Sequence, residues 1–540
     1  MRARLWLPAF LVTVILPLFA LLPHLSGPAG FVSSLADRPV PLVSGPGTGP
    51  FTAVYLIVVD GLRYDVAHST AMPFLRGLKQ TAAWGKVRVG LPSYSRPGYA
   101  RLLTGASTEL TGLTMNEQTK AAPVPTVFSL AREAGLSTAA SAHYWVKELV
   151  EGTSGPAEGF FRGRFIQYGY FYRQDDEPDA RVFANAKEIV RLDHPWLVLV
   201  LPPSVDAAGH QKGGRSPAYR KAAAAVDELL ADFYHSLPRG EKHLVIVTAD
   251  HGHRDAGGHG GEERDACEVP LFLLGEGVRP GRMKSTIDQL DIVPTIAAAL
   301  GLPMAGSMGG RVLVEAFAEE GPWASAQARL AKAQEAYLQA NSDFFSAWRS
   351  GSGLSFAEVW RRTRERALWR GAFRRLPLAL LLGGSVLVLF FRFLFSTRTR
   401  WPVLAGLAFP LYFYAFFRLL GADYSYSVMH SAGHFLGRVL IAAGMALAVS
   451  TWAGASLRRE GEGFLPSLVV GLWTVENVLF FISWTVAGGG LRGFLPDLGW
   501  HVFFLVQAVL LPLTSLYALF GWWYELGIKK KRPREVPVST

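Results

Sequence analysis

The chain has 540 residues, of which 50% are hydrophobic, and its formal net charge at pH 7 is +11. A hydrophobic fraction this high excludes a purely soluble protein of this length, so membrane segments are expected. The single cysteine, Cys267, excludes an internal disulfide framework and a cysteine-based zinc finger. Because the positive charge gathers beside apolar segments and in one arginine cluster, nucleic acid is not the expected partner.

The first predicted element is an apolar segment at residues 5–22, preceded by Arg2 and Arg4. It is long enough to span a hydrocarbon core with its basic end inside. It is either an uncleaved anchor, which we favour because no A-x-A type cleavage site stands out, or a cleaved signal peptide. In both alternatives the residues after it are exported. We assign residues 1–25 to this anchor or signal and residues 26–50 to a Pro/Gly-rich spacer.

Residues 51–320 alternate short apolar runs with helical patterns, which predicts an α/β domain. Four of these runs are rich in β-branched residues or wholly apolar, as expected for strands of a mostly parallel sheet that is buried on both faces. They span residues 54–59, 196–201, 244–248 and 271–274.

Acidic and histidine residues directly follow three of these runs. Asp60 follows the first run, Asp206 and His210 follow the second, and Asp250 and His251 follow the third. Because ligands of open α/β sheets bind outside the carboxyl ends of the strands, we expect these side chains to meet at one edge. A single aspartate after a strand is usually only a turn or a helix cap, but three such segments together predict a site.

Two sets of metal ligands are expected at this edge. Asp206 and His210 flank the flexible Gly209, and His259, in a glycine-rich segment, is a third donor. Oxygen and nitrogen donors without a thiolate suit zinc, and also manganese. The second set consists of Asp60, Asp250 and His251, and it needs a hydroxyl to complete it.

Ser95 is the candidate for that hydroxyl. It lies in the string Leu91-Pro-Ser-Tyr-Ser-Arg-Pro-Gly-Tyr99, which ends a strand-like approach and opens a helical run. At a helix N-terminus the dipole and the free N–H groups stabilise an alkoxide and an attached phosphoryl group. A bound metal would lower the pKa of the hydroxyl further and make it a nucleophile. The alternative is a serine that only caps the helix.

The next expected element is an arginine-rich helical connector at residues 321–375. A cluster of seven arginines lies between residues 361 and 375 and is interleaved with aromatic residues. This pattern suits a helix on an anionic lipid surface, and it equally suits a solvated helix between two domains.

Five apolar runs of roughly 20 residues then predict a transmembrane bundle at residues 376–523, followed by a basic tail at 524–540. The runs span residues 376–395, 402–420, 432–453, 464–487 and 498–523. With the N-terminus inside, the basic connections all fall on the cytoplasmic side. This topology makes the α/β domain extracytoplasmic, periplasmic or luminal, and the C-terminus cytoplasmic.

Five motifs, spread over about residues 52–300, resemble the alkaline phosphatase superfamily. They are Val59-Asp-Gly-Leu-Arg63, Pro92-Ser-Tyr-Ser-Arg-Pro-Gly98, Asp206-Ala-Ala-Gly-His210, Thr248-Ala-Asp-His-Gly252 and Gly258-His-Gly260. The resemblance is closest to the glycosylphosphatidylinositol ethanolamine-phosphate transferases and the type I phosphodiesterase/nucleotide pyrophosphatases. It implies an alkaline-phosphatase-like sheet sandwiched by helices.

The resemblance also implies the division of the ligands between two divalent metals. One metal takes Asp206, His210 and His259, and the other takes Asp60, Ser95, Asp250 and His251. His253 stands where relatives often carry methionine, which implies a role beside the ligands or toward the substrate. The bundle is shorter than in the eukaryotic transferases, so the resemblance does not imply the same acceptor lipid. Tyr99 replaces the arginine of the sulfatase motif, so sulfatase activity is not expected.

Four further residues are candidates for substrate binding. His143 and Trp145 either line a head-group pocket through cation–π attraction or pack as an ordinary aromatic cluster. Lys212 either contacts a phosphate oxygen or is solvated. Glu476 lies within an apolar run, where an ionisable group is a functional candidate that binds lipid or a neighbouring helix.

The sequence therefore predicts a membrane-bound enzyme that uses two divalent metals and a phospho-serine intermediate on phosphodiesters. The bundle and the arginine-rich helix favour phosphoethanolamine-type transfer to or from a phospholipid or another lipid-linked substrate. An extracytoplasmic phosphodiesterase/nucleotide pyrophosphatase is the alternative. A non-catalytic lipid-binding or transport protein is an alternative of another class, and the oligomeric state is left open.

Overall fold

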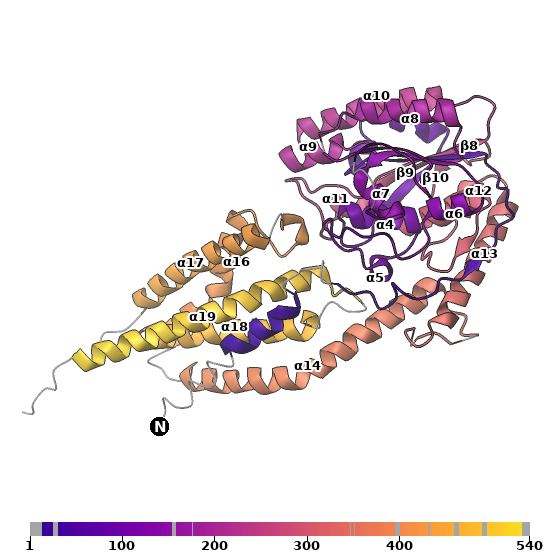
Figure 1. Ribbon diagram of the computed structural model, residues 1–540. Helices are drawn as coiled ribbons and strands as arrows, with labels where there is room; N and C mark the ends of the chain where they lie inside the picture. Colours follow the sequence, from indigo (N-terminus) through magenta and orange to yellow (C-terminus); the bar gives the residue numbers. More distant parts are fainter. Residues whose placement is uncertain are drawn as a thin grey trace, which may run out of the picture. The chain divides into compact units, whose positions relative to one another are not determined.

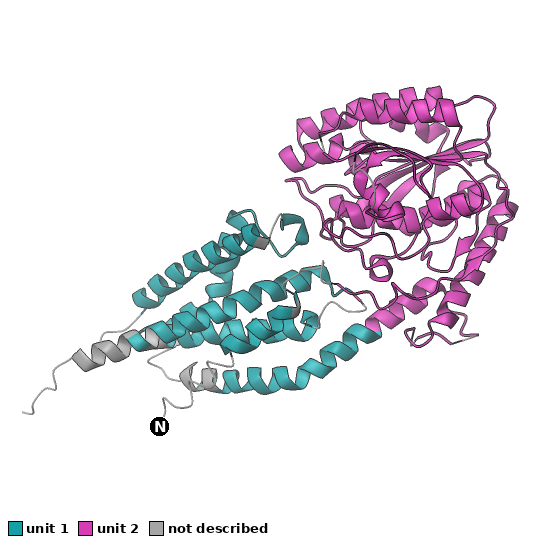
Figure 2. Ribbon diagram, in the orientation of Figure 1, with its two compact units in different colours: residues 1–30, 366–491, 495–540 teal, residues 31–365, 492–494 magenta. Residues whose placement is uncertain are grey.

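The computed structural model describes residues 13–24, 31–153, 158–174, 176–345, 347–349, 351–394, 400–429, 432–457, 464–488 and 494–531 (Figure 1). It divides into two compact units (Figure 2). The α/β unit comprises residues 31–365 and 492–494. The helical unit comprises residues 1–30, 366–491 and 495–540.

A ten-stranded mixed sheet forms the centre of the α/β unit. Its order is β10-β3-β9-β8-β2-β7-β4-β6-β5, with β11 also paired to β3. The strands are β2 (Ala53–Val58), β3 (Ala83–Arg88), β4 (Thr138–His143), β5 (Gly159–Phe161), β6 (Tyr168–Tyr172), β7 (Leu197–Val200), β8 (His243–Thr248), β9 (Glu268–Leu274), β10 (Gly281–Arg282) and β11 (Ile287–Asp288). The β3–β9, β8–β9 and β5–β6 pairs are antiparallel, and the other pairs of this sheet are parallel. The predicted α/β class with a mostly parallel sheet is confirmed.

The central strands β2, β7 and β8 bring three chain segments to one edge of the sheet. All three run parallel, with Ile57 paired to Val200 and Val58 paired to Thr248. Every residue of β2 and β7 is buried, as their unbroken apolar sequences predict for strands covered on both faces. The chain therefore leaves the three strands at the same edge, where Asp60, Asp206 and Asp250 follow.

Helices cover both faces of the sheet (Figure 1). Helices α8 (Asp179–Asp193), α9 (Ser204–Lys212) and α10 (Pro217–Ser236) lie on one face, and α4 (Ser95–Thr104), α6 (Val127–Glu133) and α12 (Ile292–Leu300) lie on the other. Further α-helices of this unit are α2 (Tyr64–Ala67), α3 (Pro73–Gly77), α5 (Thr108–Thr111), α7 (Tyr144–Glu151), α11 (Arg264–Cys267) and α13 (Glu320–Ala340). Helix α13 belongs to the core of this unit, because it buries Trp323 and Leu330 there. A separate two-stranded sheet pairs β1 (Leu42–Val43) with β12 (Met304–Ala305).

The helical unit carries the predicted membrane segments. Its helices are α14 (Phe356–Leu394, which begins in the α/β unit), α15 (Arg400–Leu407), α16 (Phe409–Leu419), α17 (Ala432–Ser456), α18 (Phe464–Ala487) and α19 (Leu498–Lys531). Among the described residues, five spans are long and apolar enough to cross a membrane: Phe356–Val388, Trp401–Leu419, Gly433–Ser456, Ser467–Ala487 and Leu498–Phe520. The five predicted membrane helices are confirmed. The arginine cluster and the first apolar run form one continuous helix, α14, with Pro377 inside it.

Two glycines allow α15 and α18 to approach closely. A Cβ atom on Gly471 would lie 2.1 Å from the carbonyl oxygen of Val403, and one on Gly406 would lie 2.2 Å from that of Leu468. No larger residue fits at either position without moving the backbone. Small residues at such crossings are typical of helix packing in membranes, where close van der Waals contact replaces the hydrophobic effect.

The N-terminal helix at residues 13–21 is held inside the helical unit by polar contacts. Thr13 Oγ1 accepts a hydrogen bond of 3.2 Å from the indole of Trp473 and lies 3.3 Å from Ser515 Oγ. Beyond its end, His24 Nδ1 lies 2.8 Å from His501 Nε2, and both rings are buried. The segment thus supplies buried hydrogen-bond partners to the later helices.

We predict that this N-terminal segment is retained as an anchor. Its removal would strip buried polar groups of α18 and α19 of hydrogen bonds, which costs about 1–3 kcal/mol for each group left unsatisfied. Intact-mass measurement and N-terminal peptide mapping of protein purified from membranes check this. A mature chain that begins after His24 would show a cleaved signal peptide instead.

Candidate metal centre and nucleophile

The candidate ligands come from the segments that leave the sheet edge. Asp60 lies two residues after the end of β2, and Asp206 and His210 lie on α9 after β7. Asp250 and His251 lie after β8, and His259 lies in the loop before α11. Asp60, Asp206, Asp250, His251 and His259 are buried, whereas the His210 side chain is 43% exposed. The structure brings all of these predicted residues together.

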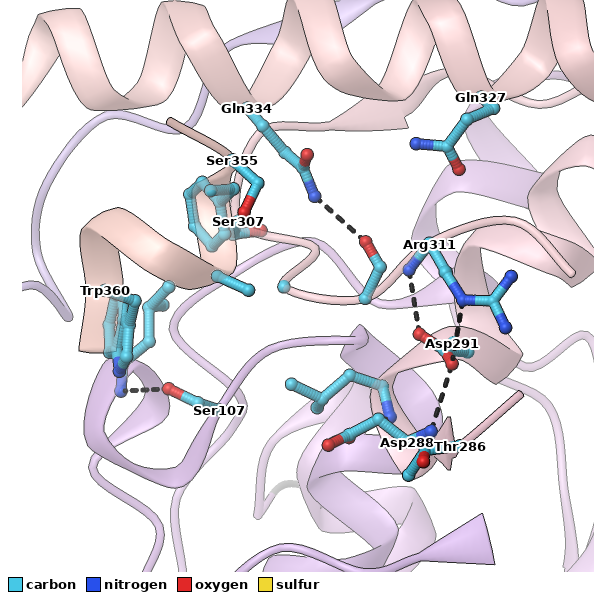
Figure 3. A pocket seen from close by; sticks show the side chains of 16 residues that line it. Ser107, Thr286, Asp288, Asp291, Ser307, Arg311, Gln327, Gln334, Ser355 and Trp360 are labelled. Carbon is cyan, nitrogen blue, oxygen red and sulfur yellow. Dashed lines mark hydrogen bonds and ion pairs between the residues drawn. The ribbon is translucent and has the colours of Figure 1, made fainter. Parts of the chain in front are cut away.

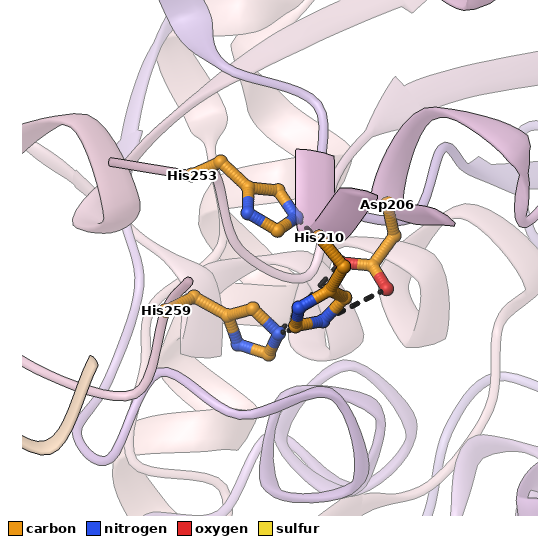
Figure 4. A group of neighbouring side chains, drawn as sticks. All are labelled: Asp206, His210, His253 and His259. Atoms are coloured by element: carbon orange, nitrogen blue, oxygen red, sulfur yellow. Dashed lines mark hydrogen bonds and ion pairs between the residues drawn. The ribbon is translucent and has the colours of Figure 1, made fainter. Parts of the chain in front are cut away.

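Four of the side chains form a first group, shown in Figure 4. His253 Nε2 lies 2.7 Å from Asp206 Oδ1, and His210 Nε2 lies 3.4 Å from Asp206 Oδ2. His259 Nε2 lies 3.0 Å from His210 Nε2 and 3.7 Å from Asp206 Oδ1. One ligand atom from each residue lies within 4.8 Å of all the others, which is compatible with one metal ion.

A second group surrounds Nε2 of His251. This atom lies 3.0 Å from Ser95 Oγ, 3.2 Å from Asp250 Oδ2, 3.5 Å from Asp60 Oδ1 and 3.9 Å from Asp206 Oδ1. Asp60, Asp206 and His251 form a possible metal-binding set by themselves. Asp206 therefore belongs to both groups and joins them, a feature that the sequence alone did not indicate.

Two glycines make this crowding possible. Gly61 has a positive φ of 70°, and a Cβ atom there would lie 2.9 Å from the side chain of Asp206. A Cβ atom on Gly209 would lie 2.5 Å from the His253 ring. Glycine is the residue that tolerates both the left-handed backbone and the close approach of a neighbouring chain.

Ser95 is the first residue of α4, and Tyr94 is the N-cap. The N-cap side chain makes no capping hydrogen bond, and the Arg96 N–H of the first turn donates to Asn116 Oδ1 at 3.0 Å, so the Ser95 hydroxyl is not used as a cap. It lies instead at the positive end of the helix dipole, with Oγ 3.0 Å from His251 Nε2. This position favours negative charge on the oxygen and on a phosphoryl group attached to it.

The electrostatics of the cluster leave most ligand atoms free to bind a cation. Burial lowers the pKa of His251 to about 3 and holds the pKa of His259 well below its usual range, so both rings are neutral at pH 7. Burial acts to raise the pKa of Asp206, but His210, His253 and His259 outweigh it and hold this pKa well below its usual range. Burial and the nearby Asp206 raise the pKa of Asp250 to about 7.

These residues fit a divalent metal ion. Asp250 Oδ2 is buried and has no hydrogen-bond partner in the described part of the chain, while its Oδ1 accepts a bond of 3.1 Å from the Gly61 N–H. A buried carboxylate oxygen without a partner is costly, and a cation between it and the neutral imidazoles removes that cost. The donors are oxygen and nitrogen, as zinc and manganese sites require.

Tyr99 contacts the candidate site, which its sequence context alone did not indicate. It is buried, and its hydroxyl donates a hydrogen bond to Asp60 Oδ2. It lies four residues after Ser95 on α4, so both side chains lie on the same helix face. That spacing is the signal that could have indicated it.

The structure places the predicted substrate-binding residues at different positions. His143 is buried, and its ring lies 4.4 Å from that of Trp145, which in turn lies 6.4 Å from the Tyr99 ring. Arg96 lies 5.0 Å from the Trp145 ring. His253 is part of the first group, Lys212 is exposed at the end of α9, and Glu476 is fully buried within α18 of the helical unit.

A cavity of about 470 Å³ lies elsewhere in the α/β unit, between the residues around Asp288, the 307–311 loop, α13 and the first turn of α14 (Figure 3). Ser307, Gln334 and Trp360 are among its lining residues. None of the candidate ligands lines it, so it is separate from the metal cluster.

Comparison with known proteins agrees with the motifs. Residues 54–262 match the model of the type I phosphodiesterase / nucleotide pyrophosphatase family. The human GPI ethanolamine phosphate transferase 2, catalytic subunit, is 24% identical over 306 residues, which are 53% of this chain and 29% of that protein. The GPI ethanolamine phosphate transferase 1 of Yarrowia lipolytica is 27% identical over 264 residues, which are 43% of this chain and 28% of that protein. The resemblance inferred from the motifs is confirmed.

Solved structures are similar to about half of the chain. Murine ectonucleotide pyrophosphatase / phosphodiesterase 5 is 15% identical with a TM-score of 0.40, and the match covers 46% of this chain and 95% of that one. The chain spans less than a third of the length of the two curated transferases named above.

Proposed function

We propose that the chain is a membrane-bound phosphotransferase that acts on phosphodiesters through a phospho-serine intermediate on Ser95. One observation carries this proposal. Ser95 Oγ, at the start of α4, lies next to His251 Nε2, and the carboxylates of Asp60 and Asp250 lie around the same nitrogen. The family match over residues 54–262 supports the same chemistry.

Two divalent ions, zinc or manganese, are the proposed cofactors. Asp206, His210 and His259 would hold one, and Asp60, Ser95, Asp250 and His251 the other. His253 would fix the orientation of Asp206, because its Nε2 lies 2.7 Å from that carboxylate. When bound, such ions lower the pKa of a coordinated hydroxyl and stabilise developing charge on phosphoryl oxygens.

The proposed reaction has two displacements at phosphorus. In the first, Ser95 Oγ forms a bond to phosphorus, the bond to the leaving alcohol breaks, and the serine proton ends on that alcohol. In the second, an acceptor hydroxyl displaces Ser95 from phosphorus and its proton returns to the serine. The N-terminus of α4 stabilises the negative charge of both steps, because its dipole points at Ser95.

Phosphoethanolamine-type transfer to or from a lipid-linked substrate is the function that we favour. The transferase relatives and the five membrane-length helices support it. Trp145 is the proposed contact for an ammonium head group, since its ring neighbours Tyr99 and is itself partly exposed. An extracytoplasmic phosphodiesterase, in which water is the acceptor, is the second candidate, supported by the family model.

The test that separates the two functions is mass spectrometry of products from two donors, phosphatidylethanolamine and a nucleotide diester. Purified full-length protein is supplied with each donor in the presence and absence of a glycan or lipid acceptor. Diacylglycerol with a phosphoethanolamine-modified acceptor supports the transferase. Hydrolysis of the nucleotide diester alone supports the phosphodiesterase, and no turnover of either donor supports a non-catalytic protein.

A further prediction concerns the helical unit. The α/β unit, residues 31–365, is expected to hydrolyse a small soluble phosphodiester like the full-length protein, because every candidate ligand lies within it. Its turnover of a bilayer-embedded donor is expected to be at least about tenfold lower than that of the full-length protein. The isolated unit lacks the membrane attachment that raises the effective concentration of lipid at the site. Parallel kinetics of both proteins on both substrates check this. Equal lipid turnover would show that the helices only anchor the site.

We propose that Glu476 takes part in this lipid handling. It is fully buried, and neither carboxylate oxygen has a hydrogen-bond partner in the described part of the chain. Intramembrane carboxyls of this kind are rare and usually functional. Glu476→Gln is expected to slow lipid turnover and to leave the kinetics on a soluble diester unchanged. Glu358→Gln, which alters a more exposed carboxylate on α14, is the matched control.

A further inference from the structure

Arg101 is a fully buried arginine on α4 whose hydrogen-bond partners in the described part of the chain are all neutral. Its relative exposure is 1%. The guanidinium donates to Gln289 Oε1 at 2.7 Å and to Thr108 Oγ1 at 2.7 Å. It also donates two longer bonds, of 3.4 and 3.3 Å, to the carbonyl oxygen of Pro92. A buried guanidinium is costly unless its hydrogen bonds are made, and an apolar residue would avoid that cost altogether.

The direction of this side chain links it to the nucleophile. Side chains on an α-helix point back toward its N-terminus, and Arg101 follows this rule, because it reaches the carbonyl of Pro92, three residues before Ser95. The chain makes room for it at Gly90, where a Cβ atom would lie 2.7 Å from the Arg101 side chain. The guanidinium therefore ties α4 to the turn that presents Ser95.

Gln289 extends this link to the metal cluster. Its Oε1 accepts from Arg101, and its Nε2 donates a hydrogen bond of 2.9 Å to the carbonyl oxygen of Asp250. Gln289 is fully buried, so water does not compete for these bonds. The turn before Ser95 is thus connected with the backbone of Asp250 through three hydrogen-bonding steps, from Pro92 to Arg101, from Arg101 to Gln289 and from Gln289 to Asp250.

We propose that Arg101 is a positioning residue that fixes the nucleophile turn relative to the Asp250 segment, directly at Pro92 and through Gln289 at Asp250. This inference rests on the proposed function of Ser95. Among the described residues, Arg101 forms no hydrogen bond with the side chain of a candidate metal ligand. Its effect is to hold Ser95 Oγ and the Asp250 carboxylate at a fixed separation, which in-line attack on phosphorus requires.

The test compares Arg101→Gln, Arg101→Lys and Gln289→Met in the full-length protein with the wild type. We expect Arg101→Gln and Gln289→Met to lower kcat by about 10²-fold, the effect typical of a displacement near 1 Å, while KM stays within about threefold. Metal content is expected to stay unchanged, and phosphorylation of Ser95 in a single turnover is expected to slow by the same factor as kcat. Arg101→Lys keeps the charge and three N–H donors but loses the planar fork of the guanidinium, so it should retain more of the rate than Arg101→Gln.

Gln334→Met is the matched control, because Gln334 is a buried glutamine that also donates hydrogen bonds to backbone carbonyls, those of Met308 and Gly310. It should lose thermal stability without losing kcat. If Arg101→Gln does not fold, Arg101→Lys and Gln289→Met decide the question. Folded, metal-loaded variants with the wild-type kcat would overturn the positioning role, as would a loss of kcat no larger than in the control. Wild-type protein that never phosphorylates Ser95 would instead refute the proposed function.

Discussion

Replacing Ser95 with alanine is expected to lower turnover of any phosphodiester at least ~10³-fold, because the variant lacks the atom that attacks phosphorus. The fold should survive this change. Ser95 is not the cap of α4, and the variant loses only the contact of its hydroxyl with His251. Loss of one such hydrogen bond costs about 1 kcal/mol.

Steady-state kinetics, together with thermal unfolding and metal analysis of the same preparations, check this prediction. Ser141→Ala is the matched control, because Ser141 is a buried serine of the same unit whose hydroxyl bonds to the Val182 carbonyl, away from the cluster. It should keep its activity. A folded, metal-loaded Ser95→Ala protein with substantial turnover would remove Ser95 as the nucleophile.

Removal of metal is the second change with a large expected effect. Chelation should abolish turnover, and zinc or manganese should restore it. Asp206→Ala is expected to weaken binding of both ions, because Asp206 lies in both ligand groups, whereas Asp250→Ala should weaken one. Activity should also fall in acid, since ligand carboxylates and imidazoles bind metal only when they are deprotonated.

Elemental analysis after dialysis, combined with activity titrations of metal into the apoprotein, checks this prediction. Asp232→Asn, which alters an exposed carboxylate on α10 paired with Lys187, is the control and should bind metal like the wild type. Full activity of a preparation verified as metal-free would refute the two-metal proposal.

The course of the central strands could be predicted from the sequence because their signals are local. Unbroken apolar runs predicted β2, β7, β8 and β9, and the residues after β2, β7 and β8 predicted the site. The parallel register then places Asp60 and Asp250 at one edge without any further information. The short edge strands β10 and β11, each of two residues, carry too little sequence to give such a pattern.

The finer contacts of the site depend on tertiary distances that no local pattern contains. The sharing of Asp206 between two groups requires α9 to be placed against the residues after β8. The 2.7 Å contact of His253 with Asp206 arises in the same way, so the sequence could identify His253 but not its partner. Arg101 and Gln289 are 188 positions apart, and only the folded chain brings them together.

The most direct test of the phospho-serine mechanism is the mass of the peptide that contains Ser95 after a single turnover. Full-length protein is mixed with a phosphodiester donor, quenched rapidly in acid, digested and analysed by mass spectrometry, with Ser95→Ala treated alongside. We expect a phosphoryl or phosphoethanolamine group on Ser95, formed within one turnover and lost when an acceptor is added. Turnover with an unmodified Ser95 peptide, or with the group on another residue, would contradict the mechanism.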